Sequence, residues 1–513
     1  MRDLVVILLL VALAGCSTGQ QPPNVVIILA DDMGYSDIGA YGGEVDTPNL
    51  DWLAKNGLQF RHFYNAGRCC PTRAALLTGR YPHRVGMGAM VSSLGSDPTA
   101  GPYQGFLSEE SATVAEELRM AGYRTYMSGK WHVGEKPEHW PRQRGFDRYF
   151  GLISGASSYY EIIKDQERTR QMVLDDTRWE PPSEGFYMTD VFTERAVGYL
   201  EDHEANHRDR PFFLYLAYTA PHWPLHAMPE DIARYRDRYA IGWDSLRAER
   251  YVRMQELGVI DGRFGLSPRP EGVPAWEDAT NKGDWALRMA VYAAMIDRMD
   301  QGIGAVLDRI ESMDARDNTL VVFLSDNGGC AESVEGRRLH DPESSIGARG
   351  SYVAYQEPWA NASNTPFRLY KQWMHEGGIA TPLIAYWPKG IAKPGRIEPR
   401  VGHVIDLMAT IRDATGNPGS EEVDGESLLP VFADAKPALS DRTLYWEHIG
   451  NRAIRRGNWK LVWNRQRGEW ELYDLRTDPA ELHDLAGQET VRVRELESLW
   501  KTWANDVGVR ERR

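Results

Sequence analysis

This sequence has few cysteines, no long apolar run and no excess of positive charge. Each of these features excludes a class of protein. Four cysteines in 513 residues are too few for a fold held together by a disulfide framework. No apolar stretch approaches the roughly 20 residues that a transmembrane helix needs, so none is expected. The 59 lysines and arginines are outnumbered by 73 aspartates and glutamates, which gives a formal net charge of −14 at pH 7. This balance excludes a general nucleic-acid binder, because such affinity rests on neutralising phosphates.

The composition that remains is typical of a large globular protein. Hydrophobic residues make up 42%, 17 tryptophans and 24 tyrosines are available for a core, and charged residues at 26% lie near the usual share. Intrinsic disorder is therefore excluded for the chain as a whole. At about 150 residues per domain, the length fits about three domains, or one large α/β domain with a smaller appendage.

The first residues of the chain predict export from the cytoplasm. Residues 4–13 form an apolar run that is too short for a permanent transmembrane helix but has the length of a signal-peptide core. The run closes with LAGC, which ends at Cys16 and resembles the bacterial lipobox, whose cysteine is acylated; ordinary cleavage without a lipid is the alternative. We expect a signal peptide over residues 1–16, a lipid on Cys16 and a tether over residues 17–23. The resulting bacterial protein would be exported and lipid-anchored in the periplasm or at the outer membrane or cell surface.

Four short apolar runs without alternation predict strands that are buried on both faces, as in a parallel sheet covered by helices. They lie at residues 25–29, 212–216, 320–324 and 383–386. Residues 112–120 and 285–307 carry apolar positions at helical spacing, so the large part of the chain is expected to be α/β. Residues 332–366 form the longest candidate loop. Beyond about residue 420, short strands separated by turns and a final amphipathic helix predict a smaller C-terminal domain with an antiparallel sheet.

Polar residues follow three of these predicted strands at the point where each strand ends. Asp31 and Asp32 follow the first run, His222 follows the second within APHWP, and Asp326 and Asn327 follow the third within SDNGG. The carboxyl ends of parallel strands meet at one edge of a sheet, where ligands bind. Three carboxylates and one amide oxygen form an all-oxygen set that suits Ca²⁺ or Mg²⁺. Taken singly, the aspartate pair equally suits a helix cap, and the Asp-Asn-Gly segment equally suits a turn.

Residues 67–80 carry the most specific motif, GRCCPTRAALLTGR. It resembles the signature of the sulfatase family, Cys-x-Pro-x-Arg followed by Leu-Thr-Gly-Arg, in which the cysteine is oxidised after translation to formylglycine (3-oxoalanine). A buried cysteine pair beside a helix start, or a vicinal metal-binding pair, would leave the proline, the arginine and the Thr-Gly-Arg unexplained. The resemblance assigns the modification to Cys69. Thr72 stands where serine is usual before the arginine, a departure that bears on maturation rather than on catalysis.

The resemblance to the sulfatase family extends over nearly the whole mature chain, with the motifs in the expected order. They are PNVVIILADD at residues 23–32, GKWHVG at residues 129–134, PHWP at residues 221–224, SDNGG at residues 325–329, Lys371 before HEGG at residues 375–378, and the C-terminal AIRRGNWKLV and ELYDL. The resemblance implies an alkaline-phosphatase-like α/β fold, with a large, mostly parallel or mixed sheet sandwiched by helices. A smaller C-terminal domain of antiparallel sheet plus helix would follow. We expect the catalytic sulfatase domain over residues 24–420 and the C-terminal subdomain over residues 421–513.

Chemically, the resemblance implies a sulfuric ester hydrolase of the arylsulfatase type that cleaves aryl sulfates or sulfated carbohydrates. The implied cofactors are formylglycine from Cys69 and a calcium ion, with magnesium the less expected metal. The implied metal ligands are Asp31, Asp32, Cys69, Asp326 and Asn327, and the implied catalytic residues are Cys69, Arg73, Lys130, His132, His222 and Lys371. A hydroxyl of the hydrated formylglycine attacks sulfur, fixed positive charge stabilises the developing anion, and histidines transfer protons. His222 is assigned to the leaving group and His132 to the diol.

The implied partners are a sulfated small molecule or glycan and a maturating enzyme, either a formylglycine-generating enzyme or an anaerobic sulfatase-maturating enzyme. Nucleic acid is not expected, and membrane contact is expected only through the N-terminal lipid. Residues that select the substrate are sought at one strand end and on the C-terminal sheet. The candidates are His403, Glu447, His448, Asn451 and Arg452, of which His403 equally well ends a strand.

Cys70 and Cys330 remain after Cys16 is assigned to a lipid and Cys69 to formylglycine. Both lie close in sequence to expected site residues, and an oxidising compartment permits a disulfide between them. Such a bond requires their Cα atoms to come within about 7 Å. We state this pairing as a hypothesis.

Rival functions exist inside and outside this family. A phosphonate or phosphate diester hydrolase of the same superfamily can share both formylglycine and the metal. A two-zinc phosphatase is less favoured, because the aspartate and asparagine sets contain no histidine ligand. A catalytically silent lipoprotein that binds sulfated glycans would need none of the proton donors among Lys130, His132, His222 and Lys371.

Overall fold

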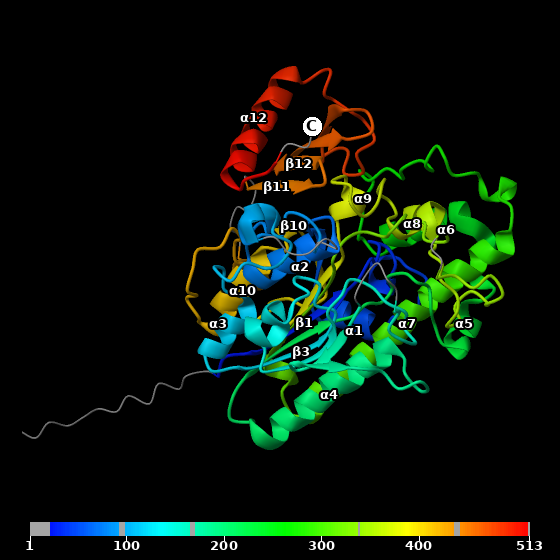
Figure 1. The fold of residues 1–513 in the computed structure, drawn as a ribbon. Helices are drawn as coiled ribbons and strands as arrows, with labels where there is room; N and C mark the ends of the chain where they lie inside the picture. Colours follow the sequence, from blue (N-terminus) through cyan, green and yellow to red (C-terminus); the bar gives the residue numbers. More distant parts are fainter. Residues whose placement is uncertain (1–20, 92–97, 165–169, 337–338, 436–441, 511–513) are drawn as a thin grey trace, which may run out of the picture.

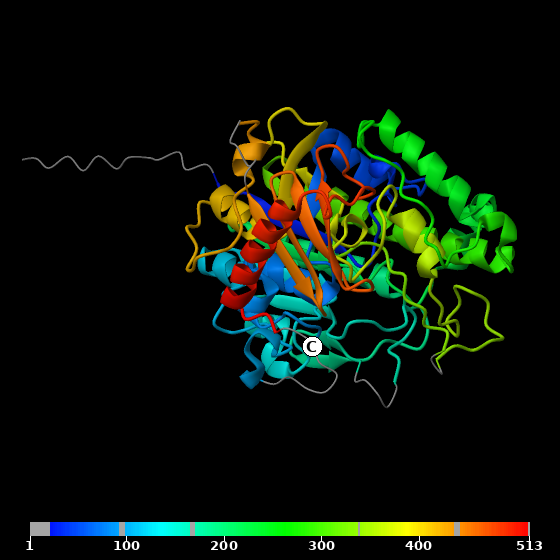
Figure 2. The same ribbon diagram turned by 90° about the horizontal axis from the view of Figure 1, so that it is seen from above.

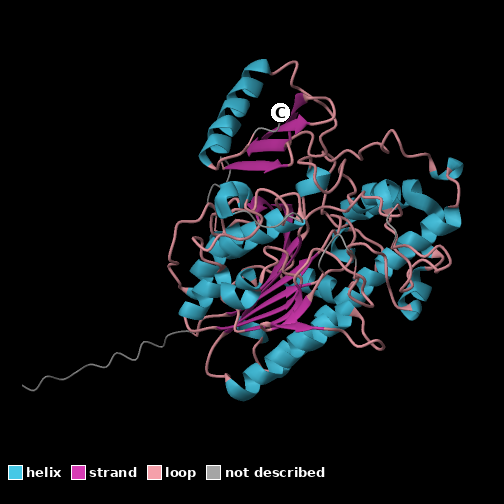
Figure 3. Ribbon diagram, in the orientation of Figure 1, coloured by secondary structure: helices cyan, strands magenta, loops and turns pink. Residues whose placement is uncertain are grey.

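The structure is a computed structural model that describes residues 21–91, 98–164, 170–336, 339–435 and 442–510. Within these residues the chain forms a large ten-stranded sheet and a small four-stranded sheet at the C-terminal end (Figure 1, Figure 3). The strand order of the large sheet is β10-β2-β9-β8-β1-β7-β3-β4-β5-β6, and that of the small sheet is β11-β12-β13-β14. The predicted combination of a large mixed sheet with helices and a small antiparallel sheet is confirmed.

The strands of the large sheet are β1 (Asn24–Ala30), β2 (Leu58–Tyr64), β3 (Arg124–Gly129), β4 (Arg148–Leu152), β5 (Met172–Leu174), β6 (Thr177–Trp179), β7 (Phe212–Ala217), β8 (Thr319–Ser325), β9 (Leu383–Tyr386) and β10 (Arg396–His403). β1 pairs in parallel with β7 on one side and β8 on the other, and β3 extends the parallel part beyond β7. All residues of β7 and β8 are buried. Their sequences lack alternation because helices cover both faces of the sheet. β9 pairs antiparallel with β2 and β8, which makes the sheet mixed.

The helices around the large sheet are α1 (Pro48–Asn56), α2 (Cys69–Thr78), α3 (Val114–Met120), α4 (Met188–Asn206), α5 (Pro229–Tyr235), α6 (Gly242–Glu256), α7 (Lys282–Ser312), α8 (Gln356–Ser363), α9 (Glu376–Ile379), α10 (Asp406–Thr415) and α11 (Leu429–Phe432). α4 and α7 pack together on one side of the sheet, and α2, α3 and α10 lie on the other (Figure 1). The helices predicted over residues 112–120 and 285–307 correspond to α3 and α7. The segment predicted as a loop over residues 332–366 contains α8, so that prediction was too long.

The small sheet consists of β11 (Thr443–His448), β12 (Asn451–Arg456), β13 (Trp459–Asn464) and β14 (Glu469–Asp474), joined as antiparallel neighbours. α12 (Thr490–Asp506) packs on this sheet, and its buried residues Leu496, Trp500 and Trp503 belong to the predicted apolar face. Seen from above, the small sheet and α12 lie over the rest of the molecule (Figure 2).

The predicted domain boundary near residue 420 stays a prediction. Arg412 in α10 donates a hydrogen bond to the carbonyl of Glu421, and α11 contacts α10, so the segment after residue 420 first remains with the large sheet. None of the helices formed by the described residues has the length and apolar character needed to cross a membrane.

Candidate active site

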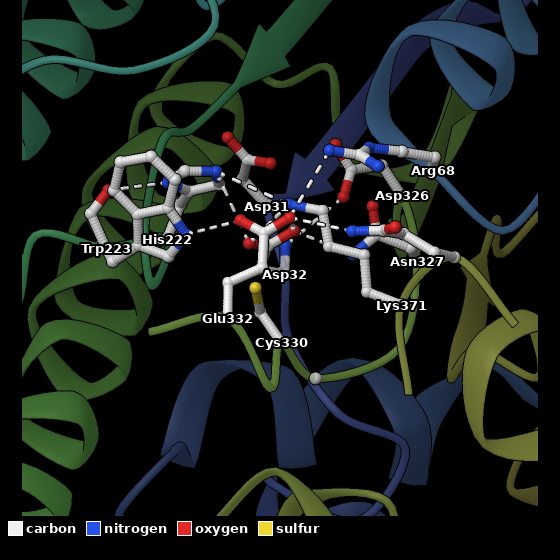
Figure 4. A network of polar contacts seen from close by, with 12 residues as sticks. Asp31, Asp32, Arg68, His222, Trp223, Asp326, Asn327, Cys330, Glu332 and Lys371 are labelled. Atoms are coloured by element: carbon white, nitrogen blue, oxygen red, sulfur yellow. Dashed lines mark hydrogen bonds and ion pairs between the residues drawn. The ribbon is translucent and has the colours of Figure 1, made fainter. Parts of the chain in front are cut away.

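The carboxyl ends of β1, β3, β7 and β8 meet at one edge of the large sheet, where polar side chains converge (Figure 4). β1 is followed by Asp31 and Asp32, β3 by Lys130, and β8 by Asp326. The N–H of Asp326 donates to the carbonyl of Ala30 at 3.1 Å, so regular backbone pairing extends to the first residue beyond β8. The rigid centre of the sheet therefore positions these side chains, as the position of the motifs at strand ends predicts.

Each of the three carboxylates at this edge is paired with a buried cation. Lys130 Nζ lies 2.5 Å from Asp31, Arg73 lies 2.8 Å from Asp326, and Lys371 Nζ lies 2.8 Å from Asp32. All six side chains are at most 3% exposed. Arg73 also donates to the carbonyl of Lys130 at 2.9 Å, which links two of the pairs. Buried charges persist only when they are paired in this way.

The pairing does not satisfy Asp31 fully. Burial, reinforced by the neighbouring Asp326, raises the pKa of Asp31 well above its usual value. Burial also acts to raise the pKa of Asp32, but His222 and Lys371 outweigh it and hold that pKa below its usual range. Lys130 and Arg73 act in the opposite direction but do not outweigh burial, and a further cation beside Asp31 would favour its charged form.

Two buried oxygen atoms of the expected metal ligands accept no hydrogen bond from any described residue. They are Oδ1 of Asp31 and Oδ1 of Asn327. Such acceptors are unfavourable unless a ligand takes their lone pairs. Ligand atoms of Asp31, Asp32, Cys69 and His222 lie within 4.8 Å of one another. The oxygen donors of this set are of the kind that a hard divalent cation prefers.

Cys69 is the first residue of α2, and its side chain is buried beside the carboxylates. Burial raises the pKa of its thiol to about 12, although Lys130 and Lys371 act in the opposite direction. The thiol is therefore protonated at neutral pH and is a poor nucleophile. The glycine of the Thr-Gly-Arg motif, Gly79, adopts a left-handed φ of 67° and ends the helix, which explains part of the motif structurally.

His222 and His132 are both buried but are held differently. Nδ1 of His222 donates to the carbonyl of Trp223 at 2.6 Å, and its Nε2 lies 3.5 Å from Nζ of Lys371. Burial lowers the pKa of His222 to about 3, so the ring is neutral. His132 has a left-handed φ of 57°, and its ring lies against Gly155, where a Cβ atom would come within 2.4 Å of it.

Asn451 is the predicted substrate-selecting residue that contacts the segment of Lys371, and His448 is its cross-strand partner in the small sheet. Nδ2 of Asn451 donates to the carbonyl of Gln372 at 2.9 Å. Nδ1 of His448 donates to the carbonyl of Gly88 at 3.3 Å. Nε2 of His448 and Oδ1 of Asn451 are buried and meet no hydrogen-bond partner among the described residues.

The other three predicted substrate-selecting residues lie apart from that pair, and their role in selecting the substrate stays a prediction. In the pairing of β11 with β12, Glu447 stands opposite Arg452, and adjacent strand residues face opposite sides of a sheet. Arg452 accordingly packs on Trp500 of α12 at 5.1 Å, and Glu447 binds His83 at 2.8 Å. His403 is the last residue of β10 and its side chain is fully buried, so both readings of it stay open.

Cys70 and Cys330 are free thiols, so the hypothesis of a disulfide between them is corrected. They pack against different segments: Sγ of Cys70 accepts the N–H of Val91 at 3.5 Å, whereas the N–H of Cys330 donates to the hydroxyl of Tyr355 at 3.0 Å. Cys16, the expected lipid acceptor, lies outside the described residues.

Sequence reasoning missed a further group of residues around the site. Glu332 accepts hydrogen bonds from Arg68, Trp223 and Gln372 (Figure 4). The three donors each neighbour a predicted site residue in the sequence, and that adjacency is the only signal that pointed to them. Glu332 lies at the start of a segment without motif or periodicity, so no sequence pattern indicated it.

Comparison with known proteins places the chain in a family. The profile described as Sulfatase matches residues 23–417, and the profile described as N-sulphoglucosamine sulphohydrolase, C-terminal, matches residues 367–502. An uncharacterized sulfatase of Schizosaccharomyces pombe is 33% identical over 95% of this chain and 94% of its own. The arylsulfatase of Klebsiella aerogenes is 33% identical over 82% of this chain and 92% of its own.

A solved structure agrees with these relatives. The crystal structure of Ps i-CgsB in complex with k-i-k-neocarrahexaose superposes with a TM-score of 0.71 at 26% identity and covers 94% of this chain and 93% of its own. The fold and the buried site at the carboxyl edge define a metal-dependent type of ester hydrolase. The chain belongs to the sulfatase family and is a hydrolase of sulfate esters.

Proposed function

We propose that this sulfatase cleaves sulfate esters of carbohydrates or aryl alcohols with a formylglycine made from Cys69 and a calcium ion bound beside it. One observation carries the proposal. Cys69 is buried at the start of α2, Lys130 and Lys371 act to lower the pKa of its thiol, and its Sγ lies within 4.8 Å of ligand atoms of Asp31 and Asp32. A nucleophile, anion-binding cations and metal-binding carboxylates are thereby joined in one buried place.

The proposed nucleophile is formylglycine rather than the cysteine thiol. A maturating enzyme would replace the thiol of Cys69 by an aldehyde in a two-electron oxidation, and the motif at residues 69–73 supports this assignment. The hydrated aldehyde supplies one hydroxyl to attack sulfur and a second through which the sulfated form returns to the aldehyde. The unmodified thiol, with a pKa raised to about 12 by burial, supplies no comparable nucleophile at neutral pH.

The proposed calcium ligands are Asp31, Asp32, Asp326 and Asn327 together with the modified side chain of Cys69. Their oxygen donors, two of them without hydrogen-bond donors, support this choice. Bound calcium would supply positive charge that polarises the nucleophile and the sulfate group. Arg73 holds Asp326 in place, and Lys371 remains protonated because Asp32 holds its pKa well above the usual value against the effect of burial.

The proposed proton donor to the leaving oxygen is His222. In the neutral ring the single proton is on Nδ1 and bonds to the carbonyl of Trp223. Nε2, which lies 3.5 Å from Nζ of Lys371, would therefore have to take up a proton before it gives one to the leaving oxygen. A positioned histidine accelerates such a step by about 10² to 10⁴. The second proposed role, base for the diol, falls to His132, which follows Lys130 in the same turn.

The proposed substrate class is a sulfated carbohydrate. Ps i-CgsB, which is 26% identical to this chain, was crystallised with k-i-k-neocarrahexaose. Nε2 of His448 and Oδ1 of Asn451 are buried beside the Lys371 segment without described partners, and they are the proposed contacts to sugar hydroxyls. Export and a lipid on Cys16, proposed from the N-terminal sequence, would bring the enzyme to glycans outside the cytoplasm.

Mass spectrometry of the peptide over residues 69–73, released by trypsin from protein made in the native host, tests the proposal. We expect the first residue to have lost its sulfur and to carry a reactive aldehyde. Cys69→Ala should then abolish hydrolysis of 4-nitrophenyl sulfate, whereas the matched variant Cys70→Ala should retain it. An active enzyme with an unmodified thiol at Cys69 would contradict the proposal. Faster cleavage of an aryl phosphonate monoester than of the sulfate would favour the diester hydrolase instead.

A further inference from the structure

One carboxylate outside the proposed catalytic set joins three segments that carry the site residues (Figure 4). Oε2 of Glu332 accepts the indole N–H of Trp223 at 3.0 Å. Its Oε1 accepts Nε2 of Gln372 at 2.8 Å and a guanidinium N–H of Arg68 at 3.3 Å. Both oxygens are therefore used, and the three donors come from segments far apart in the sequence.

Each donor is the chain neighbour of a proposed catalytic residue. Arg68 precedes Cys69, Trp223 follows His222, and Gln372 follows Lys371. Resting on the proposed function, we propose that Glu332 is a positioning residue that sets His222 and Lys371 relative to Cys69.

The segment of Lys371 needs such support. Leu369 and Gln372, on either side of Lys371, have left-handed φ values of 66° and 80°. Residues other than glycine adopt this conformation only where surrounding contacts hold it. The backbone contributes bonds from the N–H of Gln372 to the carbonyl of Gly67 at 2.9 Å and from the N–H of Lys371 to the carbonyl of Gly329 at 3.1 Å. The carbonyl of Gln372 accepts a bond from Asn451, and the bond from the Gln372 side chain to Glu332 adds the contact that fixes this side chain.

The histidine is controlled through its neighbour. The ring of Trp223 packs against that of His222 at a centroid distance of 4.5 Å and a tilt of 44°. The indole N–H is held by Glu332, so the bond fixes the surface against which the imidazole rests. Loss of this bond would free the indole to turn and would let Nε2 of His222 move from its place near Lys371.

A direct role in binding sulfate does not suit Glu332. A carboxylate near the sulfate would repel it, and here the negative charge is matched by Arg68 at 3.3 Å. The side chains of Glu332 and Arg68 are 26% and 18% exposed, so the pair lies at the rim of the site. Glu332 therefore acts on catalysis through the residues that it holds.

Leaving-group dependence separates positioning from a general structural role. We compare wild-type enzyme with Glu332→Ala on 4-nitrophenyl sulfate, whose phenol leaves readily, and on phenyl sulfate, whose phenol leaves poorly. Proton donation by His222 matters most for the poor leaving group. We expect kcat/KM to fall about 5-fold for the first substrate and about 100-fold for the second, with the larger share of the second loss in kcat.

Glu335 provides the matched control on the same segment. It accepts hydrogen bonds from Arg288, Gln356 and Ser333, none of which neighbours a proposed catalytic residue. Glu335→Ala should lower the two rates by the same factor or leave both unchanged. If Glu332→Ala also changes both rates by one common factor, the positioning role is overturned.

A double-mutant cycle tests the bond to Trp223. In Glu332→Gln the amide retains an acceptor oxygen but can present an N–H toward the indole N–H, and Trp223→Phe removes that conflict. We expect Glu332→Gln to cost about 10-fold in kcat/KM on phenyl sulfate in the wild-type background and under about 3-fold in Trp223→Phe. Equal costs in the two backgrounds would contradict the proposal. These conservative variants also answer the question if Glu332→Ala fails to fold in thermal unfolding.

Binding of inorganic sulfate distinguishes failure of this inference from failure of the proposed function. If wild-type enzyme hydrolyses neither an aryl sulfate nor a sulfated carbohydrate, the proposed function fails, while calorimetry with sulfate still reports on the placement of Lys371. We expect Glu332→Ala to weaken sulfate binding about 5- to 10-fold and Glu335→Ala to leave it within 2-fold. Equal sulfate affinity in both variants overturns the positioning role.

Discussion

At the scale of single residues, Asp31 is the active-site carboxylate whose negative charge its neighbours do not fully compensate. Lys130 is its closest ion-pair partner, yet burial and Asp326 raise its pKa and one of its oxygens accepts no described hydrogen bond. A divalent cation would supply the missing charge and take the lone pair. The proposed metal site therefore centres on Asp31.

Calcium should stabilise the wild-type protein and should no longer do so in Asp31→Asn. A ligand at 100 times its Kd stabilises the folded state by about 2.7 kcal/mol, which raises Tm by a few degrees. We expect EDTA to lower Tm, calcium to restore it, and magnesium to restore it less. Asp300→Asn is the control, because Asp300 is a buried carboxylate that accepts the backbone N–H of Leu50 at the start of α1. An undiminished calcium shift in Asp31→Asn would refute the assignment.

His226 should make stability depend on pH. The buried ring donates through Nε2 to the carbonyl of Ser351 at 2.5 Å and accepts the N–H of Tyr159 at Nδ1 at 3.3 Å. Burial lowers the pKa of His226 to about 4, against about 6.5 in the unfolded chain. Between these values the unfolded chain binds more protons, so the free energy of unfolding rises with pH from about 4 to about 6.5.

The size of this effect is measurable by urea unfolding at pH 4.5 and pH 7. The pKa difference corresponds to at most about 3 kcal/mol for His226 alone. We expect His226→Gln, which keeps a neutral donor and acceptor, to flatten the dependence by about 2 kcal/mol. His207→Gln, at a half-buried position on the surface, serves as control. An unchanged pH slope in His226→Gln would count against this account.

At the scale of elements, one buried lysine joins the small sheet to the turn that follows Lys371. Lys460 in β13 lies 2.7 Å from Glu376 at the start of α9 and 2.7 Å from Glu481. The side chains of all three residues are at most 3% exposed. The small sheet therefore contributes to the active site mechanically, because it fixes the end of the segment that carries Lys371.

Replacement of Lys460 by methionine should destabilise the protein severely. The change leaves two buried carboxylates without their cation, which costs about 3–5 kcal/mol. Lys501→Met removes an exposed pair with Glu497 on α12 and should change the free energy of unfolding by no more than about 0.5 kcal/mol. Urea denaturation of the two variants provides the comparison, and a loss below about 1 kcal/mol in Lys460→Met would contradict the mechanism.

Element prediction succeeded where the pattern was local. The buried runs that became β1, β7, β8 and β9 have no alternation, and the capping box of Thr113 and Glu116 begins α3 near the predicted place. α8 was missed because it is only eight residues long, contains a single charged side chain and lies inside a segment rich in residues that favour turns. Helices of this length depend on tertiary packing more than on propensity.

At the scale of the whole molecule, the order of the strands and the position of the small sheet were beyond sequence reasoning. Among the central strands β8, β1 and β7, nearly 300 residues separate β1 from β8 in the sequence. The two strands are nevertheless neighbours in the sheet and place Asp31 and Asp326 side by side. The sequence motifs identified the candidate catalytic residues. The pairing of strands that are distant in the sequence brought those residues together. The hypothesis of a Cys70–Cys330 bond failed for the same reason, since closeness to site residues in the sequence did not decide which segments the two thiols contact.

The proposed location of the protein, a membrane surface reached through a lipid on Cys16, is testable apart from catalysis. We expect the wild-type protein to fractionate with membranes in its native host and to be released by detergent. Cys16→Ala should move the protein out of the membrane fraction, while the specific activity on aryl sulfate stays within about 2-fold, because the described fold begins after residue 20. Ser17→Ala is the matched control. Wild-type protein found only in soluble fractions would refute the lipid anchor.

The sequence by itself determined the buried strands, the motif at Cys69 and the acidic residues at strand ends, because these signals lie within a few neighbouring positions. Only the tertiary structure decided that Glu332 bridges three separate segments, that Arg452 turns toward α12 while Asn451 turns toward Gln372, and that Cys70 and Cys330 stay apart. The physical reason is the distance along the sequence over which each kind of contact acts. Secondary structure and capping depend on local backbone geometry, whereas these contacts join residues up to hundreds of positions apart and exist only once the core has packed.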